Sequence, residues 1–209
     1  MSLVLSTKNY LEFLSSTVHT QKLDGLELTY VANEDSNGLF YYLGTNKGAS
    51  GWTNPVTAGQ MSIVVRTLQF GNPADLVDRT TNQWYTSNVA NSFVGIDIGL
   101  NRLLTLNSYT IRNRVESVEY LRTWNLEGSN NVAGNTIADY AAATWEAIDV
   151  RTGDSSLLAA NAFGHFDANM NNKKRYRFFR LIQTGPNGSS NAYLCIAELE
   201  FYGLFKETT

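Results

Sequence analysis

The amino-acid sequence predicts an all-β sandwich of the jelly-roll type. Val94, Ile96 and Ile98 recur at a period of two, the spacing that places side chains on one buried face of a strand. Short apolar or alternating runs continue beyond residue 60, separated by clusters of Gly, Asn, Asp and Ser. This punctuation is typical of successive antiparallel strands and not of strands that alternate with helices. The runs lie at 61–68, 93–98, 104–112, 121–128, 144–150, 175–183 and 194–203.

A short helix is predicted in an N-terminal extension, residues 1–25. Asn9 followed by Glu12 matches a helix cap, and apolar side chains fall at helical spacing over residues 9–18. After the extension, 26–31 and 39–43 have the composition of strands. The turn-rich segment 33–38 separates them, so the sequence predicts a hairpin here.

The last strand is expected to end the sandwich, which therefore covers residues 26–203. Ala197, Leu199 and Phe201 would face the core, while Glu198, Glu200 and Tyr202 would lie on a solvated face. Gly203 would end the strand and leave 204–209 as a short tail. The segment 129–143 is rich in Asn, Ala and Gly, so it is expected to be a long surface loop.

Composition restricts the class of protein. The chain has 209 residues, of which 43% are hydrophobic, and this is enough for one well-packed core. A net charge of −3 gives no field that would attract nucleic acid or an anionic membrane surface. Cys195 is the single cysteine, which excludes an internal disulfide, and its apolar surroundings predict a buried thiol. No segment approaches the apolar length of a membrane helix, and no secretory signal is evident, so we expect no membrane insertion.

Nine short motifs occur in one order along residues 38–203. They are Leu43-Gly44-Thr45-Asn46, Trp52-Thr53-Asn54-Pro55, Leu76-Val77-Asp78, Trp84, Gly95-Ile96-Asp97-Ile98-Gly99, Tyr109-Thr110-Ile111-Arg112, Leu121-Arg122-Thr123-Trp124-Asn125-Leu126-Glu127-Gly128-Ser129, Tyr176-Arg177-Phe178-Phe179-Arg180-Leu181-Ile182-Gln183-Thr184-Gly185 and Glu198-Leu199-Glu200-Phe201-Tyr202-Gly203. This order resembles the discoidin, or coagulation-factor C-type, family of galactose-binding-like β-sandwiches. The resemblance implies a discoidin-like jelly roll.

Within that family, the chain is most similar to the intracellular branch carried by HECT-type ubiquitin ligases and BTB-domain proteins. The first two motifs and the strand motif that begins at Leu121 indicate this branch. Extracellular members usually join their ends by a disulfide, which this chain cannot form. The resemblance therefore implies a cytoplasmic protein. Because the module is nearly the whole chain, any ubiquitin role would come through partners.

By the same resemblance, ligand binding is expected in loops at one end of the sandwich, around 47–52, 82–88, 112–120 and 186–193. Aromatic and Arg side chains dominate binding hot spots, so they are the expected contacts. The candidates are Trp52, Arg112, Arg114, Tyr120 and Tyr193. The alternative is that Trp52 belongs to the core and that the arginines are solvated or structurally paired.

A structural Ca²⁺ is a second implication of the resemblance. Carbohydrate-binding relatives hold one with an Asp-containing turn before a Trp and a Glu in the final strand, which correspond here to Asp78, Thr81 and Glu198. However, Arg79 follows Asp78 where the metal-binding turn usually has Gly. A cation there would weaken the site, so a hydrogen-bonded turn without metal is the preferred interpretation.

No pattern indicates catalysis. His19 and His165 lie in different segments and fit neither a catalytic triad nor a metal-ligand spacing. Glu198 and Glu200 could be read as a carboxylate pair of a glycosidase, but a strand face explains them. The basic run 173–180 could indicate nucleic-acid binding, but a strand with arginines on its outer face explains it.

The sequence therefore favours a non-catalytic intracellular module that binds protein partners. It would serve as an interaction or structural subunit of a larger assembly, using the loops and the N-terminal extension, with no nucleic acid and no membrane insertion. The alternative is a glycan-binding, lectin-like module that stacks aromatic side chains on sugar rings. No cofactor is expected beyond the possible Ca²⁺.

Overall fold

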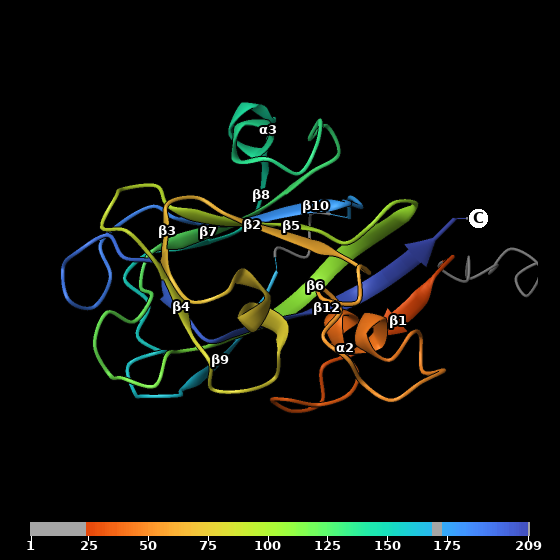
Figure 1. Cartoon of the computed structure of the whole chain (residues 1–209), viewed down its shortest axis with the longest axis horizontal. Coiled ribbons are helices and arrows are strands. Elements are labelled where there is room, and N and C mark those ends of the chain that lie inside the picture. The colour runs from red at the N-terminus through yellow and green to blue at the C-terminus, as the bar shows by residue number, and fades with distance from the viewer. Residues whose placement is uncertain (1–23, 169–172, 209) are drawn as a thin grey trace, which may run out of the picture.

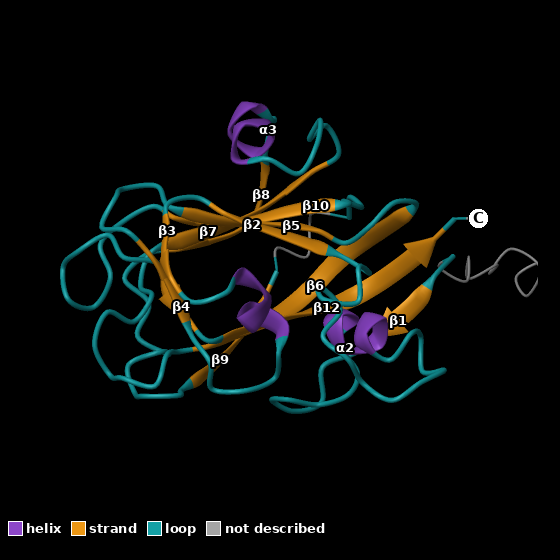
Figure 2. Cartoon of the chain, in the orientation of Figure 1, coloured by secondary structure: helices purple, strands orange, loops and turns teal. Residues whose placement is uncertain are grey.

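The prediction of an all-β sandwich is confirmed by the computed structural model, which describes residues 24–168 and 173–208 (Figures 1 and 2). Every strand pair in the described chain is antiparallel. One sheet has the order β1(Leu26–Leu28)-β12(Glu198–Glu207)-β6(Arg102–Arg112)-β9(Phe163–Asp167). A second has the order β2(Ser62–Val65)-β5(Phe93–Asp97)-β10(Phe178–Gln183)-β7(Trp124–Ser129)-β8(Glu146–Arg151). A third contains β11(Cys195–Ile196)-β4(Trp84–Thr86)-β3(Leu68–Phe70).

The four-stranded and five-stranded sheets lie face to face, with α2 (Leu39–Gly44) below and α3 (Ile137–Ala142) above them in Figure 1. A 3₁₀ helix, Pro73–Val77, leads into β4. Large apolar side chains such as Trp124, Phe179 and Phe201 fill the space between the sheets and are fully buried. The helix predicted at 9–18 lies outside the described residues. All seven predicted runs contain strands, although short β4 and β9 were not predicted.

The hairpin prediction for residues 26–43 is wrong. Strand β1 pairs with β12, and residues 39–44 form helix α2. Leu39, Phe40 and Leu43 are all buried against the sandwich, at a spacing that suits one face of a helix. The helix has no side-chain cap of its own, because Gly38 occupies the N-cap position. Its first N–H groups are instead bound by Glu200 of β12.

The expected solvated face of the last strand is also buried. Glu198, Glu200 and Tyr202 are almost fully enclosed, because α2 and the turn 30–37 cover this side of the sheet. The Tyr202 hydroxyl, for example, donates to Asp35 of that turn. The expectation of a tail from residue 204 is wrong as well, since β12 continues to Glu207 past a bulge at Gly203. A Cβ at Gly203 would lie 2.1 Å from a backbone oxygen of β6.

The segment 129–143 is not a plain surface loop, because it contains α3. Thr136 and Asp139 cap this helix reciprocally, and Tyr140 is fully buried on the outer face of the five-stranded sheet. Its ring lies over Gly95, where a Cβ would be 2.3 Å from the ring. A second apolar cluster forms there, made of Phe93, Val132, Tyr140 and Phe178. Strand β5 is consequently buried on both faces, and not only on the face of Val94 and Ile96.

The basic run 173–180 leads into a strand, as expected, but its arginines are not solvated. Arg177 forms a two-pronged ion pair with buried Asp97. Arg180 pairs with Glu127 and lies 4.5 Å from the ring centroid of Trp145. These partners satisfy the guanidinium groups within the fold, so neither is directed at an external anion.

Candidate functional site

One end of the sandwich brings together segments that are far apart in sequence. These are strand β3 and the segments 82–91, 113–120 and 185–193, which lie at the left of Figure 1 and are called the loop end here. Direct hydrogen bonds join them: Arg114 donates to Gln83, Glu119 N–H to Ser189, and Ala192 N–H to Asn88. The loop end is therefore one connected surface.

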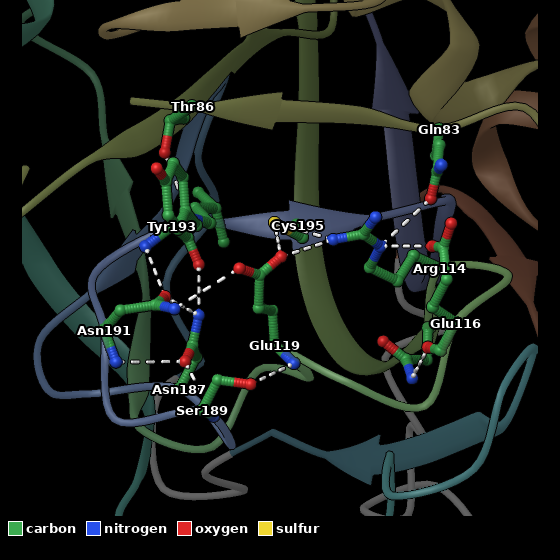
Figure 3. A network of polar contacts seen from close by, with 12 residues as sticks. Gln83, Thr86, Arg114, Glu116, Glu119, Asn187, Ser189, Asn191, Tyr193 and Cys195 are labelled. Carbon is green, nitrogen blue, oxygen red and sulfur yellow. Dashed lines mark hydrogen bonds and ion pairs between the residues drawn. The ribbon is translucent and has the colours of Figure 1, made fainter. Parts of the chain in front are cut away.

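Arg114 is the centre of a network of polar contacts at this end (Figure 3). Its Nε lies 2.6 Å from a Glu116 carboxylate oxygen and 3.2 Å from Gln83 Oε1. Its Nη1 donates to Glu119. The Arg114 side chain is only 12% exposed, so its guanidinium binds groups of the chain itself.

Asn187 organises the neighbouring loop in a similar way. Its Oδ1 accepts hydrogen bonds from the N–H groups of Ser189 and Asn191, and its Nδ2 donates to the Tyr193 carbonyl at 3.0 Å (Figure 3). Asn191 in turn donates to Glu119. These bonds connect the 185–193 loop to the 113–120 loop through side chains, which gives the loop end a fixed shape.

Aromatic rings line the side of the loop end formed by β3 and β4. Phe70 stacks on Tyr85 with 5.1 Å between ring centroids, and Tyr193 meets Tyr85 edge-on. Phe70 remains 52% exposed, which is unusual for so large an apolar side chain.

The structure places three of the five predicted contact residues at the loop end. Arg114, Tyr120 and Tyr193 are there, with the Tyr120 ring packed over Gly188. Trp52 is not, because it packs against Gly44 of α2. Arg112 is directed over the outer face of the four-stranded sheet, where it pairs with Glu34 at 3.0 Å. Their roles in binding stay predictions.

Residues that the sequence analysis did not single out complete the surface. Phe70, Tyr85 and Gln83 contribute to it directly, and Glu119 and Asn187 support it. Phe70 could have been found from the alternating triplet Leu68-Gln69-Phe70 before Gly71, which is a weak strand signal. Two of the Arg114 partners, Gln83 and Cys195, lie 31 and 81 positions away, so no local sequence pattern connects them to Arg114.

Cys195 is buried beneath the network, as its apolar setting predicted. Burial raises the pKa of its thiol to about 12, and the nearby Arg114 only partly opposes this shift. A thiol with so high a pKa is a poor nucleophile at neutral pH.

The residues of the possible Ca²⁺ site do not fit a metal. The Asp78 carboxylate accepts hydrogen bonds from Thr80 N–H, Thr80 Oγ1 and Asn82 Nδ2, which is the hydrogen-bonded turn of the preferred interpretation. Thr81 is exposed, and its side chain binds none of the described residues. Among residues 24–168 and 173–208, no group of three or more His, Cys, Asp or Glu could hold a metal ion.

Two guanidinium groups supply positive charge beside Glu198 instead. Arg112 Nη1 lies 3.9 Å from Glu198 Oε2. Arg79 has a left-handed backbone with φ of 60°, lies over the Tyr41 ring and donates to the Glu34 carbonyl. Both arginines favour the ionised form of Glu198. A divalent cation placed there would be repelled by two fixed positive charges.

We therefore expect the melting temperature of the protein to be the same in excess EDTA and in millimolar Ca²⁺. The Asp78 oxygens already have donors within the turn, so the turn is satisfied without a metal ion. Differential scanning calorimetry measures this directly. A Ca²⁺-dependent rise in melting temperature that Asp78→Asn abolishes would contradict the expectation.

Glu198 should make stability depend on pH. Burial raises its pKa to about 7, aided by Glu34 and Asp78 and opposed by Arg79 and Arg112. The folded state therefore binds more protons than the unfolded state between about pH 4.5 and 7, and stability falls as pH rises through this window. Glu198→Gln stays neutral, so relative to wild type it should gain up to about 3 kcal/mol between about pH 5 and pH 8.

Urea unfolding of both proteins at the two pH values measures this difference. Comparison of the pair removes the contributions of titrating groups that do not interact with Glu198. The Glu198 carboxylate raises the pKa of Glu200, so the difference also contains the change that this pKa undergoes in the variant. A difference that stays constant with pH would show that Glu198 is ionised throughout the range.

Comparisons with known proteins give sequence relatives and structural neighbours. The chain is 33% identical over 185 residues to a segment of the E3 ubiquitin-protein ligase hecd-1 of Caenorhabditis elegans, covering 85% of the chain and 6% of the relative. It is 29% identical to a BTB/POZ domain-containing protein of Arabidopsis thaliana, covering 86% of the chain and 22% of the relative. For the Drosophila melanogaster ligase Ufd4 the identity is 26%, with 94% and 7% covered. The chain thus spans less than a quarter of each of these curated relatives. No family model matches it.

Among solved structures, the family 32 carbohydrate-binding module of Clostridium perfringens NanJ in complex with galactose superposes with a TM-score of 0.51 and 12% identity. It covers 71% of this chain and 95% of that one. A fucolectin from striped bass, Morone saxatilis, gives a TM-score of 0.52 at 15% identity, covering 69% and 46%. At such identities these neighbours establish the fold alone. In the described residues, no helix is long and apolar enough to cross a membrane.

Proposed function

We propose that this chain, a galactose-binding-like (discoidin-like) β-sandwich, is a non-catalytic module that binds a protein partner through its loop end. The predicted resemblance is confirmed by the solved neighbours and by relatives that include two ubiquitin ligases and a BTB-domain protein. In those relatives the matching segment is a small part of a much larger chain. This supports a role as an interaction subunit inside the cell.

Exposed apolar side chains at the loop end carry the proposal. Of the eleven large hydrophobic residues that are exposed in the described chain, five lie there: Leu68, Phe70, Val89, Val115 and Val118. Such a concentration at one end of the sandwich is typical of a surface that is covered by another protein. The polar network beneath it keeps the loops in place, so little conformational entropy would be lost on binding.

The anchors we propose are Phe70 and Tyr193, with Tyr120 beside them. Phe70 is the most exposed aromatic ring of this surface, and aromatic anchors commonly dominate binding energy. Arg114 acts as a positioning residue, because its guanidinium is engaged by Gln83, Glu116 and Glu119.

The test compares a loop-end variant with a matched control. The loop-end variant removes two exposed apolar side chains through the substitutions Phe70→Ser and Val118→Ser. The control removes two exposed apolar side chains elsewhere, through Leu100→Ser and Val150→Ser. Partners captured from native cells are purified and titrated against each protein by calorimetry. We expect the loop-end variant to bind at least about tenfold more weakly than the control. Equal binding by both variants, or capture of no stoichiometric partner, would overturn the proposal.

A glycan-binding module is the second candidate. The open hollow beside Phe70 favours it, because an exposed ring there adjoins polar Asp75, Asn82 and Gln83, and its volume is about 420 Å³. Aromatic stacking with nearby hydrogen bonds suits a sugar ring. A glycan array with wild type and Phe70→Ser tests this candidate, and absence of any sugar binding at millimolar concentration removes it.

A further inference from the structure

A cleft at the loop end lies beside the exposed apolar surface and differs from it in chemistry. Its volume is about 390 Å³, which is within the range of small-ligand sites. None of its lining residues is charged or aromatic. Four of them carry carboxamides, and we call the cleft the amide cleft: Asn88, Asn91, Gln183 and Asn191.

Gln183 is the buried one of the four carboxamide residues that line the amide cleft. It is 2% exposed, and its Nε2 donates to the carbonyls of Gly185 and Asn191 at 2.9 and 3.3 Å. Its Oε1 is also buried but accepts no hydrogen bond from the described residues. A buried acceptor without a donor costs free energy.

The rim of the amide cleft offers further polar groups that the fold does not use. Asn88 Oδ1 accepts the Ala192 N–H at 2.8 Å, which orients its NH₂ group. The Asn91 carboxamide makes no hydrogen bond to the described residues, and its backbone is held in the left-handed region with φ of 58°. The rim therefore presents both donors and acceptors at fixed positions.

We infer that the amide cleft binds a short, uncharged polar segment of peptide, and this inference rests on the proposed protein-binding function. A carboxamide pairs with a peptide group through one donor and one acceptor. Asn91 keeps both groups free of the described residues and Asn88 adds its NH₂ group, so the rim matches a segment of extended main chain or Asn and Gln side chains. A charged segment would be desolvated without a partner in this cleft. A sugar ring would find no aromatic platform, because the lining contains none.

A random peptide library of about twelve residues, displayed on phage and selected on the full chain, tests the inference. We expect enriched peptides that lack charge and are rich in Asn, Gln, Ser, Thr and Gly. Ala90→Trp fills the mouth of the cleft from an exposed turn position, so it should weaken their binding by at least about tenfold. Leu100→Trp, at another exposed position, serves as the control and should bind them like wild type.

A ¹⁵N NMR titration provides a second readout, in which the side-chain NH₂ signals of Asn88, Asn91 and Gln183 are followed. The enriched peptides are one probe, and a panel of neutral methyl glycosides is the other. The inference is overturned if no peptide is enriched, if the enriched peptides are charged or bind Ala90→Trp unchanged, or if glycosides and not peptides shift these signals. Partner capture that survives Ala90→Trp but not the Phe70 and Val118 double variant would refute this inference alone and leave the proposed function intact.

Discussion

Replacing Glu200 with alanine should destabilise the fold by about 3–6 kcal/mol, the largest effect we expect from a single change. Glu200 is enclosed between β12 and α2. Its Oε1 accepts hydrogen bonds from Phe40 N–H at 2.7 Å and Phe201 N–H at 2.9 Å, and its Oε2 accepts from Tyr41 N–H at 3.0 Å. Without the carboxylate, three backbone donors lose their acceptor, two of them at the uncapped start of α2.

Urea unfolding followed by circular dichroism measures this loss. Glu200→Gln keeps an acceptor oxygen and should lose less stability than Glu200→Ala. Glu27→Ala is the matched control, because this exposed strand glutamate makes one side-chain hydrogen bond to the residues that the structure describes, to Asn107. The control should change stability by less than about 1 kcal/mol. A loss of similar size in Glu200→Ala and Glu27→Ala would show that the carboxylate does not hold α2 in place.

The same glutamate explains why the sequence predicted a strand at 39–43. An apolar run of five residues fits either a strand or a turn of helix, and local capping residues usually decide between them. Here Gly38 provides no side-chain cap, and the cap comes from a residue 160 positions away. Tertiary contacts of this kind cannot be read from local sequence.

Alternation of apolar and polar residues locates a strand, but it does not show whether the second face of that strand is also packed. It located β5 and β12, but it assigned the second face of β12 to solvent and predicted no packing on the second face of β5. Tyr140 covers one of these faces and the turn 30–37 the other. Both covers come from segments with the composition of loops. In each segment one residue packs on the sheet, namely the buried Tyr140 and the partly buried Asp35.

The sequence predicted the site only as far as the order of its motifs predicted the fold. Motif order implied that the segments 82–88, 112–120 and 186–193 would meet, and hydrogen bonds between them confirm this. It also grouped 47–52 with them, but the Trp52 ring lies on Gly44 of α2. Which arginine faces outward depends in part on partners that are distant in sequence, such as Gln83 for Arg114 and Glu34 for Arg112.

Arg114→Ala should destabilise the protein by about 2–4 kcal/mol and weaken partner binding as a consequence. The change leaves the carboxylates of Glu116 and Glu119 without their cation, and it removes the donor to Gln83 Oε1. Because Glu119 also binds Asn191 and Ser189, the 185–193 loop would lose its support from the 113–120 loop. Arg66→Ala is the control, since the Arg66 side chain makes one hydrogen bond within the described part of the chain, to the Asn91 carbonyl.

A conservative variant, Arg114→Lys, distinguishes a positioning role of Arg114 from direct contact with the partner. Arg114→Lys keeps the charge but cannot reproduce the fork of bonds to Gln83, Glu116 and Glu119. If Arg114 holds the loops, this variant should show faster amide hydrogen exchange over 113–120 and 185–193, and its affinity should fall in step with its stability. If Arg114 instead touches the partner, exchange in the free protein would stay at the wild-type rate while affinity drops. That second outcome would return Arg114 to the contact role expected from the sequence, and it would place the binding surface over the network and not beside it.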